Sequence, residues 1–211
     1  KEEFTALAKR VKEKLTEYHR LFDIYHSYEG INNIRTINEN AGIAPVQVDR
    51  ELLSLLLFAK EQYDRTGGKV NIALGSVLRI WHDYREKGID DPENAELPPG
   101  KLLEEAARHT KIEALIIDEE ASTVYLADPA MRLDVGAIAK GYAVERTARY
   151  LEEEGVSSLL LNVGGNVRAI GGKPGRRGSE PWKIGIKNPD QESSATVLCN
   201  VLITDSSVVS S

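Results

Sequence analysis

The sequence predicts an α+β fold, in which a mainly helical half, residues 1–110, precedes a mainly sheet half, residues 111–211. In the first half, apolar residues recur at three- and four-residue steps. From about residue 114 the pattern changes to alternation, and a run of strands follows one later helix at 136–154. A doubly wound parallel sheet would instead alternate strands with helices along the chain. We therefore expect one domain with a mixed or antiparallel sheet and packed helices.

The helical half divides at clear start and stop signals. Residues 1–22 have helical spacing, and 25–45 should be loop with at most one short helical turn. Asp49 is a predicted N-cap of a helix that ends at Thr66-Gly67-Gly68. The next segment begins extended and becomes helical near Ser76. After a surface loop at 90–100, residues 101–110 should form a short helix.

The sheet half is predicted from alternating apolar residues. A hairpin is expected at 114–118 and 123–127, and Gly155 is a suitable residue to end the helix 136–154. Further strands are expected at 157–163, 166–172, 182–189 and 195–204. No closing element is predicted in the last residues, ITDSSVVSS.

Composition excludes several classes of function. The net charge is −6 and basic residues do not cluster, so we expect no nucleic-acid partner. Cys199 is the only cysteine, which excludes an internal disulfide and a Cys₄ or Cys₂His₂ zinc site. No apolar run is long enough to span a bilayer. The four histidines lack metal-ligand spacing and are expected to be structural or surface residues.

The segment RLDVGAIAKG could carry chemistry. Small residues at 136, 137 and 139 leave the helix start open to an anion, and Lys140 lies one turn above Gly136. Asp134 could accept from a ligand hydroxyl or from backbone N–H groups. The alternative is structural: Asp134 is a near-cap, the small residues serve packing, and Lys140 is solvated. On spacing alone both interpretations stay open.

Two glycine-rich segments have the same two interpretations. In NVGGN, Gly164-Gly165 predicts a tight turn with positive φ, and glycine also lets a ligand approach the backbone. In TGGKVN, Gly67-Gly68 either ends a helix before a buried Trp81 or brings Asn71 to a ligand.

Taken together, three segments resemble the ApbE-type flavin transferases, the FAD:protein FMN transferases. They are LFDIYHSYEGINNIRTIN, GGKVNIALGSVLRIW and LDVGAIAKGYAVERTARYLEEEGVSSLLLNVGGNVRAIGGKP. The resemblance covers nearly the whole chain and implies an ApbE-like, T-fold-related domain. It implies a Mg²⁺-dependent enzyme that splits FAD, moves FMN to a Thr or Ser hydroxyl of an acceptor redox protein, and releases AMP. The alternative is an FAD-binding protein or an FAD pyrophosphatase of the same fold.

The resemblance also implies roles for particular residues, and no catalytic side chain is among them. Asp134 and Lys140 would contact FAD, and the backbone carbonyl of Ala137 would contact the metal. The other expected FAD contacts lie in three segments: Tyr25 or Tyr28; Lys69, Val70 and Asn71; and Gly164, Gly165 and Asn166. The family usually has Asp where this chain has Asn71.

Two further expectations concern the whole protein. We expect the family's C-terminal part, with the Asp and Thr that complete the Mg²⁺ site, to be missing from this chain, so that these 211 residues alone are nearly inactive. Family members are exported and often lipid-anchored, so we expect a lipoprotein on the periplasmic or extracellular face.

Overall fold

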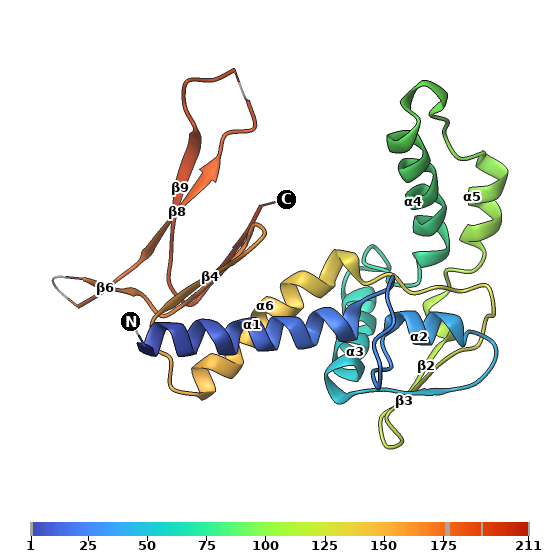
Figure 1. Ribbon diagram of the computed structural model, residues 1–211, viewed down its shortest axis with the longest axis horizontal. Helices are drawn as coiled ribbons and strands as arrows, with labels where there is room; N and C mark the ends of the chain where they lie inside the picture. The colour runs from blue at the N-terminus through green and yellow to red at the C-terminus, as the bar shows by residue number, and fades with distance from the viewer. Residues whose placement is uncertain (1, 176–177, 191, 211) are drawn as a thin grey trace. The chain divides into compact units, whose positions relative to one another are not determined.

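The computed structural model describes residues 2–175, 178–190 and 192–210, and its contacts divide the chain into two compact units. The central unit is Thr16–Ala139, and the terminal unit is Lys1–Leu15 with Lys140–Ser211. Helices α1 (Glu2–Phe22) and α6 (Gly136–Glu153) each contribute residues to both units. Helices and small antiparallel sheets are both present, so the α+β prediction is confirmed (Figure 1).

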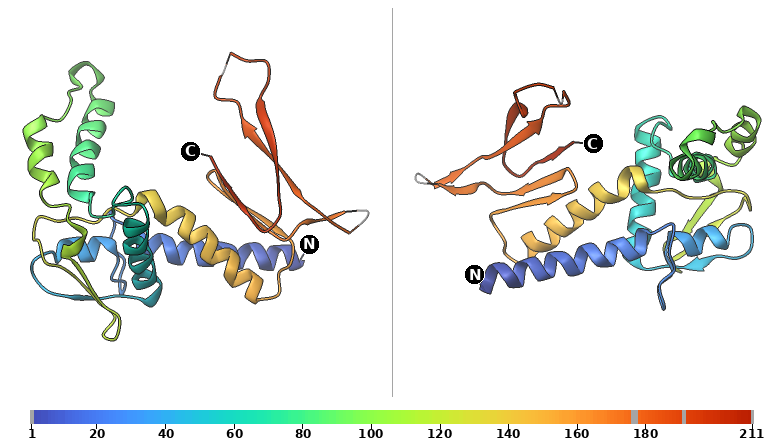
Figure 2. Two further views of the ribbon diagram at one scale, coloured as in Figure 1. Left: turned by 180° about the vertical axis from the view of Figure 1, so that it is seen from behind. Right: turned by 45° about the horizontal axis from the view of Figure 1, so that its top comes forward.

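The central unit is mainly helical. It contains α2 (Ile34–Glu39), α3 (Arg50–Arg65), α4 (Gly75–Asp90) and α5 (Gly100–Ala107), with 3₁₀ turns at Pro92–Asn94 and Ile112–Ala114. Asp49 caps α3 by accepting a hydrogen bond from the backbone N–H of Glu51, as predicted. The short helical turn predicted within 25–45 is α2, whose N-cap Asn33 forms a capping box with Thr36. Helices α4 and α5 lie side by side in Figures 1 and 2.

A small sheet completes the central unit. The predicted hairpin is present as β2 (Leu115–Asp118) and β3 (Thr123–Leu126). A further strand, β1 (Val46–Gln47), pairs with β3 and was missed because two residues cannot show alternation. The core of this unit takes buried residues from α2, α3, the sheet and the segment before α6, among them Ile34, Leu52, Leu55, Leu56, Leu115, Leu126, Met131 and Leu133.

The terminal unit is built from strands around α6 and the first part of α1. Strands β4 (Leu159–Val163), β5 (Asn166–Ile170) and β10 (Ser207–Val209) form one sheet in the order β10-β5-β4. The remaining strands form two hairpins: β6 (Lys173–Gly175) with β7 (Gly178–Glu180), and β8 (Trp182–Lys187) with β9 (Val197–Ile203). The core of the unit contains Ala148, Leu151, Leu161 and Ile170, with Leu7 and Val11 of α1 packed against it.

Two expectations from the sequence are wrong. The last residues do form an element, because β10 pairs with β5 and opposes Ser207 to Arg168. Trp81 is not buried, since 44% of its surface is exposed on α4.

Across the described residues no helix combines the length and the low polarity needed to cross a bilayer.

Candidate functional site

A cavity of about 470 Å³ lies in the central unit, where the loop after α1, helices α2 and α4 and the segment before α6 come together. Two of the predicted site residues, Tyr25 and Asp134, line it. Most of the other lining side chains are charged or titratable: Arg35, Glu39, Arg79, His82, Asp83, Glu86 and Arg132. The cavity is therefore suited to a polar ligand that also presents an aromatic surface to Tyr25.

The loop that carries Tyr25 is organised by Asp23, a buried carboxylate directly after α1. Its Oδ1 accepts from the backbone N–H of Tyr25 at 2.7 Å, and its Oδ2 accepts from the Tyr28 hydroxyl at 2.8 Å. The side chain of His26 also donates to Oδ2, at 3.0 Å. Burial alone would raise the pKa of Asp23, but these hydrogen bonds outweigh it and lower the pKa to about 2. The loop is therefore fixed by an ionised carboxylate.

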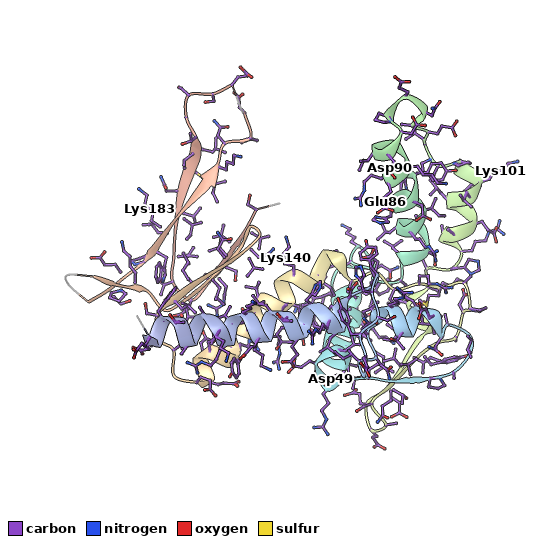
Figure 3. The ribbon with its side chains drawn as sticks, viewed as in Figure 1. Asp49, Glu86, Asp90, Lys101, Lys140 and Lys183 are labelled. Atoms are coloured by element: carbon purple, nitrogen blue, oxygen red, sulfur yellow. The ribbon has the colours of Figure 1, made fainter. Side chains whose placement is uncertain are left out.

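Tyr25 stacks in a tilted arrangement on His82 of α4, with ring centroids 5.3 Å apart. His82 is held at both nitrogens, because Nε2 lies 2.9 Å from Glu86 and Nδ1 lies 2.8 Å from the Arg85 guanidinium. Burial and then the negative charge of Asp134 raise the pKa of the Tyr25 hydroxyl, so it stays protonated near neutral pH. The two rings offer a fixed aromatic surface to a ligand. Figure 3 labels Glu86 on α4.

Tyr28 is placed differently. Its hydroxyl donates to Asp23 and lies 3.3 Å from Nε2 of His19, and it is not among the residues that line the cavity. Of the two tyrosines left open by the sequence, Tyr25 is the one that faces the cavity.

Asp134 sits immediately before α6. Its Oδ1 accepts from the backbone N–H of Gly136 at 2.8 Å, and its own N–H donates to Ile72 at 2.8 Å. The neighbouring Leu133 is fixed by Asn38, whose side chain bonds both its N–H and its carbonyl. Asp134 thus caps the helix and lines the cavity at once, because only Oδ1 is used in the cap. The structural and the ligand-binding interpretations are compatible.

Lys69, Val70 and Asn71 form the connection between α3 and α4 and do not line the cavity. The Val70 N–H donates to Thr66, and the Asn71 side chain donates to the Thr110 carbonyl while accepting from the Ala73 N–H. Asn71 thus ties the connection to the residues after α5. An Asp at this position could not make the donation to Thr110.

The other predicted FAD contacts, Lys140, Gly164, Gly165 and Asn166, lie in the terminal unit and are brought together there. Lys140, labelled in Figure 3, donates from Nζ to the carbonyl of Gly164 at 3.1 Å. Gly164 and Gly165 have φ of +52° and +87°, which confirms the predicted tight turn between β4 and β5. Asn166, which follows them, is buried. The helix-start motif and the glycine turn, chosen separately in the sequence, are thus in contact.

The described residues offer few donors for a metal ion. The part of the chain that the structure describes contains no group of three or more His, Cys, Asp or Glu side chains placed to hold an ion. Ala137 lies in the first turn of α6 and could offer a backbone carbonyl, but one carbonyl does not satisfy Mg²⁺, which binds mainly to carboxylate and phosphate oxygens. The described residues therefore do not fit a complete magnesium site.

Several residues that line the cavity are not marked by any pattern in the sequence. His82, Arg79 and Arg132 were not chosen, because single charged residues on a helix or loop usually face solvent. Asp23 had a signal: an Asp directly after a helix, followed by a polar loop, often binds the N–H groups two and three residues ahead.

Comparison with known proteins agrees with this architecture. A model of the ApbE family matches residues 2–211. A protein of Klebsiella pneumoniae (strain 342), named FAD:protein FMN transferase, is 32% identical over 98% of this chain and 59% of its own length. One of Treponema pallidum (strain Nichols), with the same name, is 34% identical over 84% of this chain and 50% of its own length. The chain thus spans about half to three-fifths of these relatives.

Solved structures extend the match to the fold. The ApbE protein of Thermotoga maritima MSB8 superposes with a TM-score of 0.78 at 25% identity, covering 96% of this chain and 61% of that chain. The flavin transferase ApbE of Vibrio cholerae has a TM-score of 0.70 and covers 94% of this chain and 59% of its own, and at 22% identity it supports the fold alone. The resemblance inferred from the three sequence segments is confirmed, and the chain belongs to the ApbE family.

Proposed function

We propose that this chain is the FAD-binding part of an FAD:protein FMN transferase, which moves FMN from FAD to a Thr or Ser hydroxyl of an acceptor protein and releases AMP. The observation that carries the proposal is the cavity of the central unit, where the aromatic surface of Tyr25 and His82 and the carboxylate of Asp134 are found together. An aromatic ring and a nearby hydrogen-bond acceptor are what a nucleotide needs for its base and its sugar hydroxyls. The names of the two curated relatives support the same substrate.

The chemistry proposed is phosphoryl transfer, in which positioning and charge neutralisation supply most of the rate. The hydroxyl oxygen of the acceptor forms a bond to the FMN phosphorus. The bond between that phosphorus and the bridging oxygen breaks, AMP leaves with this oxygen and its electron pair, and the hydroxyl proton passes to solvent. In this account Asp134 accepts from a ligand hydroxyl and Tyr25 packs against a ring. The contact of Lys140 with FAD is proposed on the resemblance alone. Mg²⁺ is proposed as the metal of the reaction on the resemblance, and no step is assigned to it because the described donors do not hold it.

Intact mass spectrometry tests this function. The full-length protein is mixed with FAD, Mg²⁺ and a Thr-containing acceptor domain, and the mass of the acceptor is measured. A gain of one FMN moiety that disappears with EDTA supports the transferase. AMP release without any gain supports a pyrophosphatase instead. The Asp134→Ala variant should bind FAD more weakly than the unsubstituted protein, and equal affinity would remove the role given to Asp134.

Export and a lipid anchor are also proposed, on the resemblance alone. Metabolic labelling of the native host with a radioactive fatty acid, followed by fractionation, tests this proposal. An unlabelled protein in the cytoplasmic fraction would contradict it.

A further inference from the structure

Arg79 and Arg132 line the cavity without a carboxylate partner. None of the ion pairs among the described residues includes either guanidinium group. The neighbouring carboxylates are mostly engaged: Glu39 pairs with Arg35 at 2.6 Å, and Glu86 lies 2.9 Å from His82. Asp83 lies one turn from Arg79 on α4 but does not come within ion-pair distance of it. Neither guanidinium group therefore forms a salt bridge within the described residues.

The Arg132 guanidinium is held in place by the backbone. Its Nη1 donates to the carbonyls of Pro129 at 2.9 Å and Met131 at 2.6 Å, while its Nε and Nη2 make no hydrogen bond within the described residues. A guanidinium fixed on one side with free donors on the other is prearranged to bind an oxyanion.

The start of α4 lies directly against this segment. A Cβ at Gly75 would overlap the carbonyl oxygen of Arg132, so only glycine allows the approach. Arg79 follows one turn later on α4, and the N-cap Leu74 makes no side-chain capping bond. The positive end of the helix dipole therefore adds to the two guanidinium groups.

The electrostatics of the pair favour an incoming anion. Burial lowers the pKa of Arg132, and the charge of Arg79 lowers it further, against the opposing effect of Asp128. Asp128 is itself engaged, since its carboxylate lies 2.8 Å from Nδ1 of His109 and accepts from the Ala130 N–H at 2.9 Å. An anion placed between the two guanidinium groups would remove their mutual repulsion.

The same two arginines also line a second cavity of about 370 Å³ beside α5. The first cavity offers the aromatic surface of Tyr25 and His82, and the second is lined partly by apolar side chains, including Ile80 and Leu102. A ligand with a ring system on each side of its phosphates, as in a dinucleotide, matches two cavities separated by a pair of cations.

We propose that Arg79 and Arg132 bind the phosphate of the nucleotide that this cavity accepts, with an aromatic ring of the ligand against Tyr25 and His82. The assignment rests on the proposed function for the identity of the ligand, and it adds two phosphate-binding residues from the central unit. They act as positioning residues that select phosphorylated ligands over nucleosides.

Isothermal titration calorimetry in EDTA, without acceptor, tests the assignment on the protein as it exists. The ligands are FAD and two matched pairs, FMN with riboflavin and AMP with adenosine. The protein should bind the phosphorylated member of at least one pair about tenfold or more tightly than its partner. Arg79→Gln and Arg132→Lys should each remove most of that preference. Lys87→Gln takes one positive charge from the same helix outside the cavity and should keep it.

Three outcomes would contradict the assignment. One is full phosphate preference in both arginine variants. Another is that inorganic pyrophosphate binds as tightly as FAD, because Arg79 and Arg132 would then form a general anion site and not a nucleotide site. The third is that the unsubstituted protein binds none of the ligands, in which case the proposed function fails with it. If the protein transfers FMN to an acceptor while Arg79→Gln and Arg132→Lys keep the full preference for phosphorylated ligands, the proposed function stands and the role of the two arginines is wrong.

Discussion

The two units of the chain differ in what their key polar side chains contact. In the central unit, Tyr25, Arg79 and Asp134 leave polar atoms open to the cavity. In the terminal unit, charged groups bind one another: Arg168 lies buried in β5 and pairs with Glu145 at 2.9 Å and with Glu152 at 3.2 Å, both on α6. From this difference we infer which property a substitution in each unit changes. Changes at the cavity should reduce ligand affinity, and changes in the terminal unit should reduce stability.

The largest effect is expected at Arg168. Arg168→Leu removes the buried partner of Glu145 and Glu152, and because both glutamates are partly exposed to solvent the free energy of unfolding should fall by about 2 kcal/mol. Chemical denaturation measures the change. Arg149→Leu removes an exposed guanidinium from the same Glu145 and should cost about 0.5 kcal/mol. Equal losses in the two variants would show that burial of Arg168 is not the cause.

The central unit also contains a buried charge, the carboxylate of Asp23, which fixes the loop that carries Tyr25 and Tyr28. Its folded-state pKa of about 2 lies below the ordinary value of 3.8, so its stabilisation is complete above pH 4 and is lost as the pH falls toward 2. The difference corresponds to about 2 kcal/mol. Asp23→Asn should therefore be destabilised at pH 7 and should respond less to acid between pH 4 and 2.

Thermal unfolding across that pH range measures the effect, with the exposed Asp64→Asn as the control. An unchanged acid response in Asp23→Asn would mean that another carboxylate fixes the loop.

Gly165 tests the turn that Lys140 contacts. Gly165 and Gly155 have nearly equal φ, +87° and +86°, but a Cβ at Gly165 would overlap the Ser210 carbonyl oxygen whereas a Cβ at Gly155 meets nothing within 4 Å. Backbone strain alone should cost each alanine variant about 1 kcal/mol. Gly165→Ala should lose clearly more than Gly155→Ala in denaturation experiments. Equal losses of unfolding free energy in the two variants would show that the close approach of Gly165 to Ser210 does not contribute to stability.

The smallest effect on stability is expected at Lys140, a residue of the terminal unit with a proposed FAD contact. Its side chain is exposed and, among the described residues, donates to the Gly164 carbonyl alone, so Lys140→Ala should change the free energy of unfolding by less than about 0.5 kcal/mol. The affinity of the Lys140→Ala variant for FAD should nevertheless be several-fold lower than that of the unsubstituted protein. Lys183→Ala removes an exposed lysine of the same unit, labelled in Figure 3, and should leave both quantities unchanged. A drop in melting temperature with intact FAD affinity would favour a structural role for Lys140.

The sequence predicted the elements whose signals are local. The helix 136–154 and the Gly164-Gly165 turn follow from spacing and from glycine, and α6 and the turn are found where expected. Strands β1 and β10 were missed because their stability comes from pairing with β3 and β5, which are distant in sequence. A short strand that depends on such a partner leaves no period to detect.

The candidate site was predicted only where a motif marks it. Asp134 and Lys140 stand in a motif with recognisable spacing, whereas His82, Arg79 and Arg132 gain their importance from the meeting of α4 with the segment before α6. That meeting depends on the close approach at Gly75, which no local pattern reveals. Tyr25 and Tyr28 could not be separated by sequence because both lie in one loop, and Asp23 decides which of them faces the cavity.

The most direct test of the central claim is an NMR titration of the isotope-labelled protein with FAD. We expect the backbone signals of the cavity residues to shift first and most, above all those of Tyr25, His82, Arg132 and Asp134, while the signals of the β8–β9 hairpin stay unchanged. Shifts centred on β8 and β9, with the cavity signals unchanged, would contradict the assignment of FAD to the central unit.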